Sequence, residues 1–505
     1  MGDDRDRAAR AGVGTMTVAL THGPATTTGP LAHGVGSAEG LPLPLDLVLQ
    51  AGAATVMVSF LIAAFGWRTP RLKPSEPRRF GVARRLRYPV LALALYVTGF
   101  ALAGPREGNP AAHALFVWLW VGLIPISVVF GPVWRAVNPL RTVFTLLGLP
   151  RRGLRPLPPG HPRSSWPAAA FLLAFVWFEL LAPHHGDPVT VGLWILGYAL
   201  SQMIIALYRG EEWFARGDCF EVYSDLAGRL SPLRHRKALS GLAPAAVPRS
   251  TPTAPPRGAP SSSPERTSSV AVSTQDGPSP LPDASLPGGT SSPSGAALSD
   301  GSLPQSGASS SSGVISAALR PGAGRETGRP PLVAAGLAGF IAIWWGSTVF
   351  DSVSASPFWT GLTERAGHPL LLGSAALILV CTVVFLALRR TAGATDVSLS
   401  LIPIAVGYTL AHYLSVLIVE APRGVLLLLG ESTAGWDPQP TPAVIATAQI
   451  ALILIGHAIG VFVAHDHALE SAAQRPALAV LADELPLVLF MILCTWAGLF
   501  LLFVR

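Results

Sequence analysis

Apolar runs that approach the thickness of a lipid bilayer recur along most of this 505-residue chain. A helix needs about 20 apolar residues to cross the hydrocarbon core of a membrane. Hydrophobic residues make up 50% of the chain and charged residues only 13%, a balance that ordinary soluble proteins do not have. The sequence therefore predicts an all-α, polytopic helical membrane protein whose main partner is the lipid bilayer.

The apolar runs predict about ten transmembrane helices, which form two halves of five. The predicted segments are residues 43–67, 89–103, 112–133, 167–182 and 189–208 in the first half, and 332–348, 369–388, 401–419, 442–464 and 485–504 in the second. Two halves of five would suit an inverted repeat. The halves share no visible sequence similarity, so the repeat is only a topological possibility.

Basic residues in the loops predict the orientation of the chain. The strongest cluster follows the first segment and consists of Arg68, Arg71, Lys73, Arg78, Arg79, Arg84, Arg85 and Arg87. Because short cytoplasmic loops carry an excess of lysine and arginine, this loop is predicted to be cytoplasmic and both termini extracytoplasmic, in a cell membrane. The net charge of +7 is attributed to topology, so no nucleic-acid partner is predicted.

Composition divides the chain into four parts. Residues 1–40 are predicted to be a disordered extracytoplasmic N-terminus, and residues 41–242 the first membrane half. Residues 243–331 are rich in Ser, Pro and Gly and have no spanning apolar run. Such a segment cannot bury enough apolar surface to offset its conformational entropy, so it is predicted to be a disordered cytoplasmic linker. Residues 332–505 form the second membrane half.

Two cytoplasmic segments of the first half are predicted to lie at the membrane surface. Residues 210–234 contain one apolar stripe, so they are expected to form an amphipathic helix on the inner surface or against the bundle. Its acidic residues are interpreted as the polar face of that helix. The run Trp134–Arg141 is interpreted as a helix stop and inner-face anchor, and a binding site for anionic head groups is the alternative.

His412 and His457 lie inside apolar segments, where an ionisable side chain suggests function. Gly456 and Gly460 flank His457 and predict a close helix–helix contact, in which the histidine would form a hydrogen bond. The alternatives are a metal or haem ligand and a proton carrier. The two histidines are expected about 8 Å apart in depth, which argues against a shared haem. A transporter or metal/haem-handling protein would place both along a pathway.

A second group of polar residues is predicted near the outer face. Glu179, His184, His185 and Asp187 lie within nine residues of one another, and His412 and Glu420 could join them. Two histidines with two carboxylates suit a divalent metal ion. Such a site activates water for ester hydrolysis, with His412 and Glu179 as catalytic residues and His184, His185, Asp187 and Glu420 as metal ligands. His457 is the candidate cofactor ligand. A solvated turn between prolines is the simpler alternative.

The run His465, Asp466 and His467 ends the segment that contains His457. Successive residues on a helix point in different directions, so the three side chains cannot bind one ion together. The run is interpreted as a polar membrane edge.

Several motifs resemble a known family. They are residues 31–67, G-D-C-F-E-V-Y-S-D-L-A-G-R-L-S-P at 217–232, A-H-Y-L-S at 411–415 and G-H-A-I-G-V-F-V-A-H-D-H-A-L at 456–469. They are similar to actinobacterial multi-pass membrane proteins labelled fenitrothion hydrolase. The resemblance covers most of both halves and implies hydrolysis of phosphotriester-like esters. The family has arginine where this chain has His467, which weakens a ligand role there. A structural membrane component is the third hypothesis.

Overall fold

The computed structural model describes residues 41, 43–66, 85–158, 164–231, 331–391, 399–436, 438, 440–471 and 477–503. Within these ranges every regular element is a helix and none is a strand, so the predicted all-α class is confirmed. The predicted N-terminal segment 1–40 and, apart from Pro331, the predicted linker 243–331 lie outside the described residues. The described helices of both halves belong to one compact unit.

The described residues contain seven helices that are long and apolar enough to cross a membrane. They are α1 (Leu45–Gly66), η2 with α4 (His113–Val121 and Leu123–Phe130), α8 (Pro188–Arg209), α13 (Pro331–Ser354), α15 (Pro369–Thr391), α18 (Pro442–Ser471) and α19 (Ala477–Phe503). An eighth span results if α16 (Ile402–His412) and α17 (Leu414–Leu428) count as one. The shorter apolar helices are α3 (Arg87–Ala103) and α7 (Trp166–Leu181). Every predicted apolar segment thus corresponds to a helix or a helix pair.

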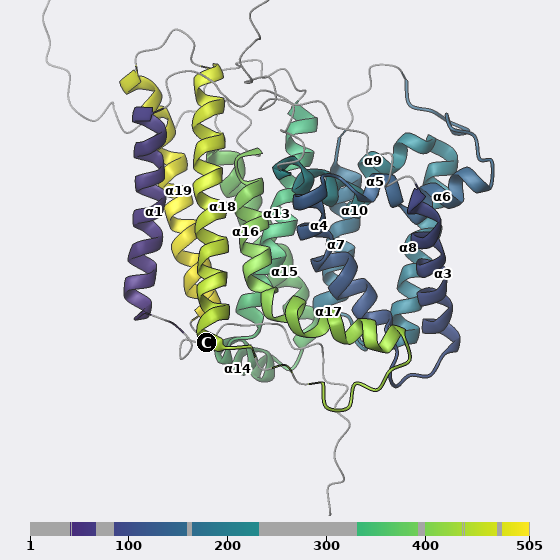
Figure 1. Cartoon of the computed structure of the whole chain (residues 1–505). Helices are drawn as coiled ribbons and strands as arrows, with labels where there is room; N and C mark the ends of the chain where they lie inside the picture. The colour runs from purple at the N-terminus through teal and green to yellow at the C-terminus, as the bar shows by residue number, and fades with distance from the viewer. Residues whose placement is uncertain are drawn as a thin grey trace, which may run out of the picture. The chain divides into compact units, whose positions relative to one another are not determined.

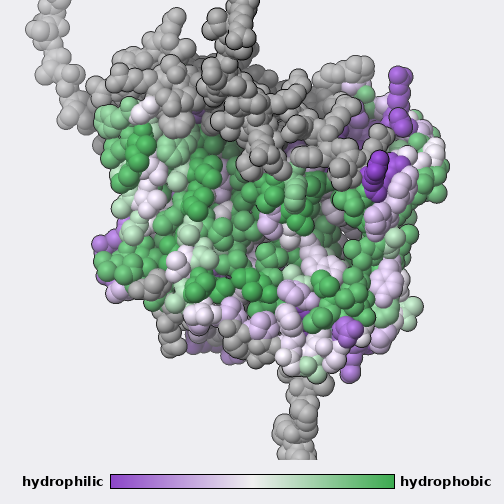
Figure 2. Space-filling model, viewed as in Figure 1, coloured by the Kyte–Doolittle hydropathy of each residue, from purple (hydrophilic) through white to green (hydrophobic). Residues whose placement is uncertain are grey.

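Helix α13 lies at the centre of the bundle, where it packs against α7, α15 and α16 (Figure 1). Of its apolar window, 83% is buried, against 17% for α15 and 22% for α8. The outer helices instead expose large apolar side chains such as Phe65, Leu95 and Leu371. Figure 2 shows the resulting broad apolar surface. Because exposed apolar patches of this size mark contact with lipid or other apolar partners, these are the helices of an integral membrane protein.

Several helices begin at a capping residue that is followed by proline. The side chain of Asn138 accepts hydrogen bonds from the backbone at the start of α6 (Pro139–Leu146), and Asp187 does the same for α8. Ser356 caps α14 (Pro357–Ala366). Small polar residues satisfy the first amide groups of a helix, and proline fits the first helical position because its missing N–H is not needed there. These starts are therefore encoded locally.

In residues 210–231, the described part of the predicted amphipathic helix 210–234, there are four short elements instead of one helix. They are η3 (Glu211–Trp213), α9 (Phe214–Gly217), α10 (Cys219–Ala227) and η4 (Gly228–Leu230). Asp218 and Glu221 are only 0% and 3% exposed, so the prediction of a solvated polar face is wrong for these two residues. They are buried because polar partners from neighbouring helices meet them inside the bundle.

Candidate functional site at a helix break

The predicted segment 401–419 is not one straight helix. Helix α16 ends at His412, α17 begins at Leu414, and the two axes differ by 63°. Tyr413 stands at the break, with φ −95° and ψ 10°. Figure 1 shows α17 running across the end of the bundle rather than along it. The break therefore leaves His412 and Tyr413 at a change of direction inside the protein.

Asp351 of α13 meets both residues of the break. Its Oδ2 atom is 2.8 Å from Nε2 of His412 and accepts a hydrogen bond of 3.2 Å from the hydroxyl of Tyr413. The side chains of Asp351 and His412 are 1% and 0% exposed. An ionised carboxylate only accepts hydrogen bonds, so Nε2 carries a hydrogen in this pair.

The other ring nitrogen of His412 faces a chain of hydroxyl groups. Its Nδ1 atom is 3.2 Å from Oγ of Ser352, which in turn is 3.0 Å from the hydroxyl of Tyr408. Ser352 also donates to the carbonyl of Thr348 at 3.1 Å. A hydroxyl has one hydrogen and can also accept, so Ser352 accepts from a protonated Nδ1 while it donates to Thr348, and it must turn its hydrogen away from Thr348 to donate to an unprotonated Nδ1.

Glu179 of α7 is buried close to this cluster. Its side chain interacts electrostatically with Asp351, and no described group forms a hydrogen bond with its Oε2 atom. A cavity of about 30 Å³ lies beside it, lined by Phe116, Val117, Val121, Glu179, His185, Gly186, Tyr413 and Val416. Both predicted catalytic residues, Glu179 and His412, are therefore within one buried cluster around Asp351.

The turn between α7 and α8 uses most of its polar groups locally. His184 is exposed and has a positive φ of 56°. The ring of half-buried His185 forms a 2.9 Å hydrogen bond with the carbonyl of Ala182. Asp187 caps α8 and lies 3.8 Å from Arg106. Of the three residues, only His185 lines the cavity beside Glu179.

Glu420 is held elsewhere, on α17. Its carboxylate lies 2.9 Å from Nε2 of His113 and 3.5 Å from Arg423. Nearby, the indole of Trp118 donates a 3.0 Å hydrogen bond to the carbonyl of Ala421. Together these contacts fix α17 against η2, the π-helix that begins at His113. Glu420 therefore has a clear structural role.

The predicted metal ligands are not brought together. In the part of the chain that the structure describes, no three His, Cys, Asp or Glu side chains are grouped so that they could hold a metal ion. Asp187 serves as a helix cap and Glu420 pairs with His113, so the residues present do not fit the predicted divalent site.

His457, the candidate cofactor ligand, lies apart from the cluster. It is 2% exposed, its Nδ1 atom bonds to the carbonyl of Ile453 on its own helix at 2.8 Å, and no described group forms a hydrogen bond with its Nε2 atom. A Cβ on Gly456 would lie 2.6 Å from the carbonyl oxygen of Pro403 in α16. The predicted close helix contact is thus confirmed, although the hydrogen bond of His457 does not cross it.

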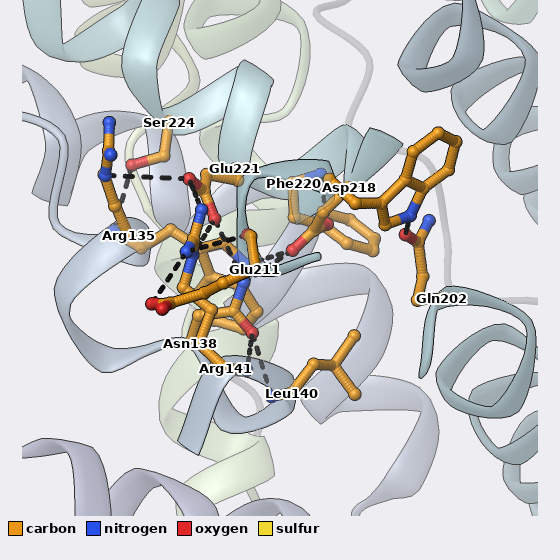
Figure 3. A network of polar contacts seen from close by, with 12 residues as sticks. Arg135, Asn138, Leu140, Arg141, Gln202, Glu211, Asp218, Phe220, Glu221 and Ser224 are labelled. Carbon is orange, nitrogen blue, oxygen red and sulfur yellow. Dashed lines mark hydrogen bonds and ion pairs between the residues drawn. The ribbon is translucent and has the colours of Figure 1, made fainter. Parts of the chain in front are cut away.

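A second buried polar network (Figure 3) lies near α6, at the end of the bundle opposite to α17 (Figure 1). Arg141 donates two hydrogen bonds of 2.7 Å to the carboxylate of Glu221, one from Nε and one from Nη2. Asp218 accepts hydrogen bonds from Trp134, Asn138, Tyr198 and the amide of Phe220. The segment Trp134–Arg141 therefore binds the start of α10, and its role as an inner-face anchor or a head-group site stays a prediction.

Burial dominates the electrostatics of Asp218. Desolvation, reinforced by the nearby charge of Glu221, raises the pKa of Asp218 to about 6, although hydrogen bonds from Tyr198, Trp134 and Asn138 oppose the rise. The side chain is thus ionised at neutral pH and takes up a proton in mildly acidic solution. Every hydrogen-bond partner of the carboxylate that the structure describes is a donor. We interpret the network as a structural junction.

The run His465–His467 is not the polar edge that its composition suggests. His465 and Asp466 are each 3% exposed, and Nδ1 of His465 lies 3.0 Å from Glu484 of α19. The pair joins α18 to α19 inside the bundle. The expectation of a solvated membrane edge is therefore wrong for these two residues.

Sequence reasoning gave Asp351, Ser352 and Tyr413 no role in the site, although it expected Asp351 near the same outer face as Glu179. The predicted segment ended at residue 348, whereas α13 continues to Ser354. One signal was present, because Val349 and Phe350 extend the apolar run to Asp351. The pairing of Asp351 with His412 depends on contacts between helices that the sequence does not display.

The described geometry is that of an integral membrane protein with an ionisable cluster buried at a broken helix. Comparison of the chain with known proteins finds no matching family model, no matching curated protein and no matching solved structure.

Proposed function

We propose that this protein is a membrane transporter that couples its transport cycle to proton binding. The observation that carries the proposal is the Asp351–His412 pair, which is buried at the 63° break between α16 and α17. Ionisable side chains inside a membrane are costly and mark ion pathways or proton relays. Transporters commonly place their ion sites where a spanning helix is interrupted.

The chemistry of the pair suits a reversible proton site. Histidine changes charge in the physiological pH range, and the Asp351 carboxylate can hold either a proton or the charged imidazole. A proton on Asp351 would remove the charge that His412 and Tyr413 now face at 2.8 and 3.2 Å. Because both residues lie at the break, proton binding would change the hydrogen bonds that set the direction of α17.

Proton flux into vesicles tests the proposal. Purified protein would be reconstituted into liposomes that contain a pH-sensitive dye, and a pH gradient would be imposed with a potassium ionophore to balance charge. We expect Asp351→Asn and His412→Gln to reduce flux at least tenfold. His368→Gln, which changes an exposed histidine, should transport normally. Absence of flux in the unmodified protein, or equal flux in all variants, would overturn the proposal.

Ester hydrolysis is a second candidate, which the resemblance to the fenitrothion hydrolase family implies. It is favoured by the hydrogen-bonded order Ser352, His412, Asp351, since a hydroxyl, an imidazole and a carboxylate make a nucleophile and its base. Ser352 Oγ would bond to phosphorus and pass its proton through His412 to the departing alcohol, and water would then release the serine. All three residues are buried, so this reaction needs an opening of the helix break.

Turnover of a chromogenic phosphotriester tests this second candidate. The purified protein should release the coloured alcohol, and Ser352→Ala should abolish the release while the protein still elutes as a single species. If the unmodified protein shows no turnover above a buffer control, hydrolysis of this substrate class is excluded.

A further inference from the structure

Glu179 differs from three other buried acids of the described bundle, Asp351, Asp218 and Glu221, because one of its carboxylate oxygens forms no hydrogen bond with a described group. Asp351 accepts hydrogen bonds from His412 and Tyr413, Asp218 accepts four, and Glu221 is gripped by Arg141. Among the described residues, the Oε2 atom of Glu179 has no hydrogen-bond partner, although the residue is only 5% exposed. Burying an ionised carboxylate oxygen that accepts no hydrogen bond costs free energy. A proton or a water molecule that binds Glu179 would remove this cost.

The groups that face Glu179 come from four different elements. Asp351 of α13 and Tyr223 of α10 interact with it electrostatically, as does Tyr413 at the helix break. His185, from the turn that precedes α8, lines the same cavity. None of these groups is a fixed cation such as lysine or arginine. The neighbouring carboxylate of Asp351 makes simultaneous ionisation of both acids still more costly.

The cavity beside Glu179 has room for water. One water molecule needs about 10 to 15 Å³ of such space, and the cavity provides about 30 Å³. Water also needs polar partners, which Glu179, Tyr413 and His185 supply. A metal cation would require several oxygen ligands, and the lining side chains offer oxygen only from Glu179 and Tyr413. The space therefore fits one or two water molecules rather than a bare cation.

We propose that Glu179 and this cavity form the proton access path that connects the turn at His185 with the Asp351–His412 pair. The inference rests on the proposed transport function and names the side from which protons reach the site. The turn lies at the same end of the bundle as α14 and α17 (Figure 1). Protons thus enter at this end, and Glu179 holds them halfway.

Each transfer along this path moves one proton and changes no other bond. The Nδ1 atom of His185 bonds to a carbonyl, which only accepts, so Nδ1 carries the hydrogen and Nε2 can accept a proton from solvent. That proton passes through cavity water to the Glu179 carboxylate. Glu179 then returns to its ionised form as the proton passes to Asp351.

Substitution of Glu179 gives the first test, in vesicles that impose the pH gradient described above. Glu179→Gln keeps the shape of the side chain but cannot carry a proton, so we expect at least a tenfold loss of proton flux. Glu107→Gln changes an exposed carboxylate and should leave flux unchanged. Infrared difference spectra across a pH titration should lose the carboxylic-acid band of a buried group in Glu179→Gln.

Chemical blockade gives an independent test that does not alter Glu179. A Cβ on Gly186, which lines the cavity, would meet nothing within 4 Å, and the same holds for Gly361 of α14. The natural cysteines, Cys219, Cys381 and Cys494, are all buried. A membrane-impermeant, positively charged thiol reagent on both sides of the vesicle should therefore stop flux in Gly186→Cys and spare Gly361→Cys.

The outcomes separate this inference from the proposed function. If Asp351→Asn abolishes flux while Glu179→Gln and labelled Gly186→Cys transport normally, the access path is wrong and the transport function stands. If the unmodified protein moves no protons, the transport function itself fails. If Glu179→Gln loses both flux and its carboxylic-acid band, and labelled Gly186→Cys is blocked, the access path is supported.

Discussion

The Nε2 atom of His412 lies 2.8 Å from Oδ2 of Asp351, although the two residues are 61 positions apart in the chain and neither reaches the surface. Each side chain offsets part of the desolvation free energy of the other. Removing one partner of a buried pair leaves an uncompensated polar group, which costs more than the pair contributes to stability.

The first prediction concerns this mutual dependence. His412→Ala should lower the free energy of unfolding by about 3 to 5 kcal/mol, because the Asp351 carboxylate loses its nearest donor. Asp351→Asn in the same chain should recover part of the loss. Thermal unfolding in detergent of the two single variants and the double variant measures this coupling. Strictly additive effects would show that the two side chains do not depend on each other.

The second prediction tests the junction near α6. Arg141→Ala should destabilise the protein by about 3 to 5 kcal/mol, because it leaves the buried carboxylate of Glu221 without its main ion-pair partner. Arg135→Ala is the matched control, because the Arg135 side chain is 68% exposed and lies 3.9 Å from the same carboxylate. Its loss should cost less than about 1 kcal/mol. Similar melting temperatures for both variants would refute a structural role for the Arg141 pair.

The third prediction follows from the raised pKa of Asp218. The carboxyl has an ordinary pKa of 3.8 and a folded pKa of about 6, so the folded protein binds the extra proton in this interval. The contribution of Asp218 to the free energy of unfolding is therefore fully present below about pH 4, and it is lost as the pH rises through 6. A shift of about two units corresponds to about 3 kcal/mol.

Asp218→Asn removes the titrating group and isolates its contribution. Melting temperatures of both proteins would be measured between pH 4 and 7. The advantage of the unmodified protein over the variant should shrink between pH 4 and 6 and then stay level. A constant difference across this range would show that burial does not raise the pKa of Asp218.

The fourth prediction concerns the contact between α16 and α18. A Cβ on Gly407 would lie 2.5 Å from the carbonyl oxygen of Leu452, so Gly407→Ala should force the helices apart and cost about 1 to 3 kcal/mol. Gly197→Ala is the control, because nothing lies within 4 Å of its Cβ position in α8. There, alanine should be neutral or stabilise the helix by up to about 1 kcal/mol. Equal destabilisation would contradict the close contact.

The helices themselves could be predicted from the sequence because apolar length is a local property. Every predicted apolar segment corresponds to a helix, and Gly456 indicated a close helix contact that the structure contains. The capping residues Asn138 and Asp187, each followed by proline, are also local signals. About ten spans were predicted, and the described residues contain seven, or eight with the bent pair α16 and α17, because α3 and α7 are short.

The candidate site could be predicted only in part. Glu179 and His412 stood out because they interrupt apolar runs, whereas Asp351 lay just past the predicted end of its segment. The outer acid and histidine residues were grouped by their expected depth near the outer face, yet Glu420 pairs with His113 on another element. Asp218 and Glu221 matched the polar face of a surface helix. Their burial depends on Arg141 and Asn138, about 80 positions away.

The burial of α13 has a consequence for how the protein is made. This helix has the lowest mean hydropathy of the candidate spans, and it carries Asp351 and Ser352. It therefore gains less than the other spans from contact with lipid. Its neighbour α7 is synthesised before it, but α15 and α16 are synthesised after it. Stable insertion of α13 thus depends on helices that the ribosome has not yet produced. The central helix is stably inserted in the membrane only after α15 and α16 have been synthesised.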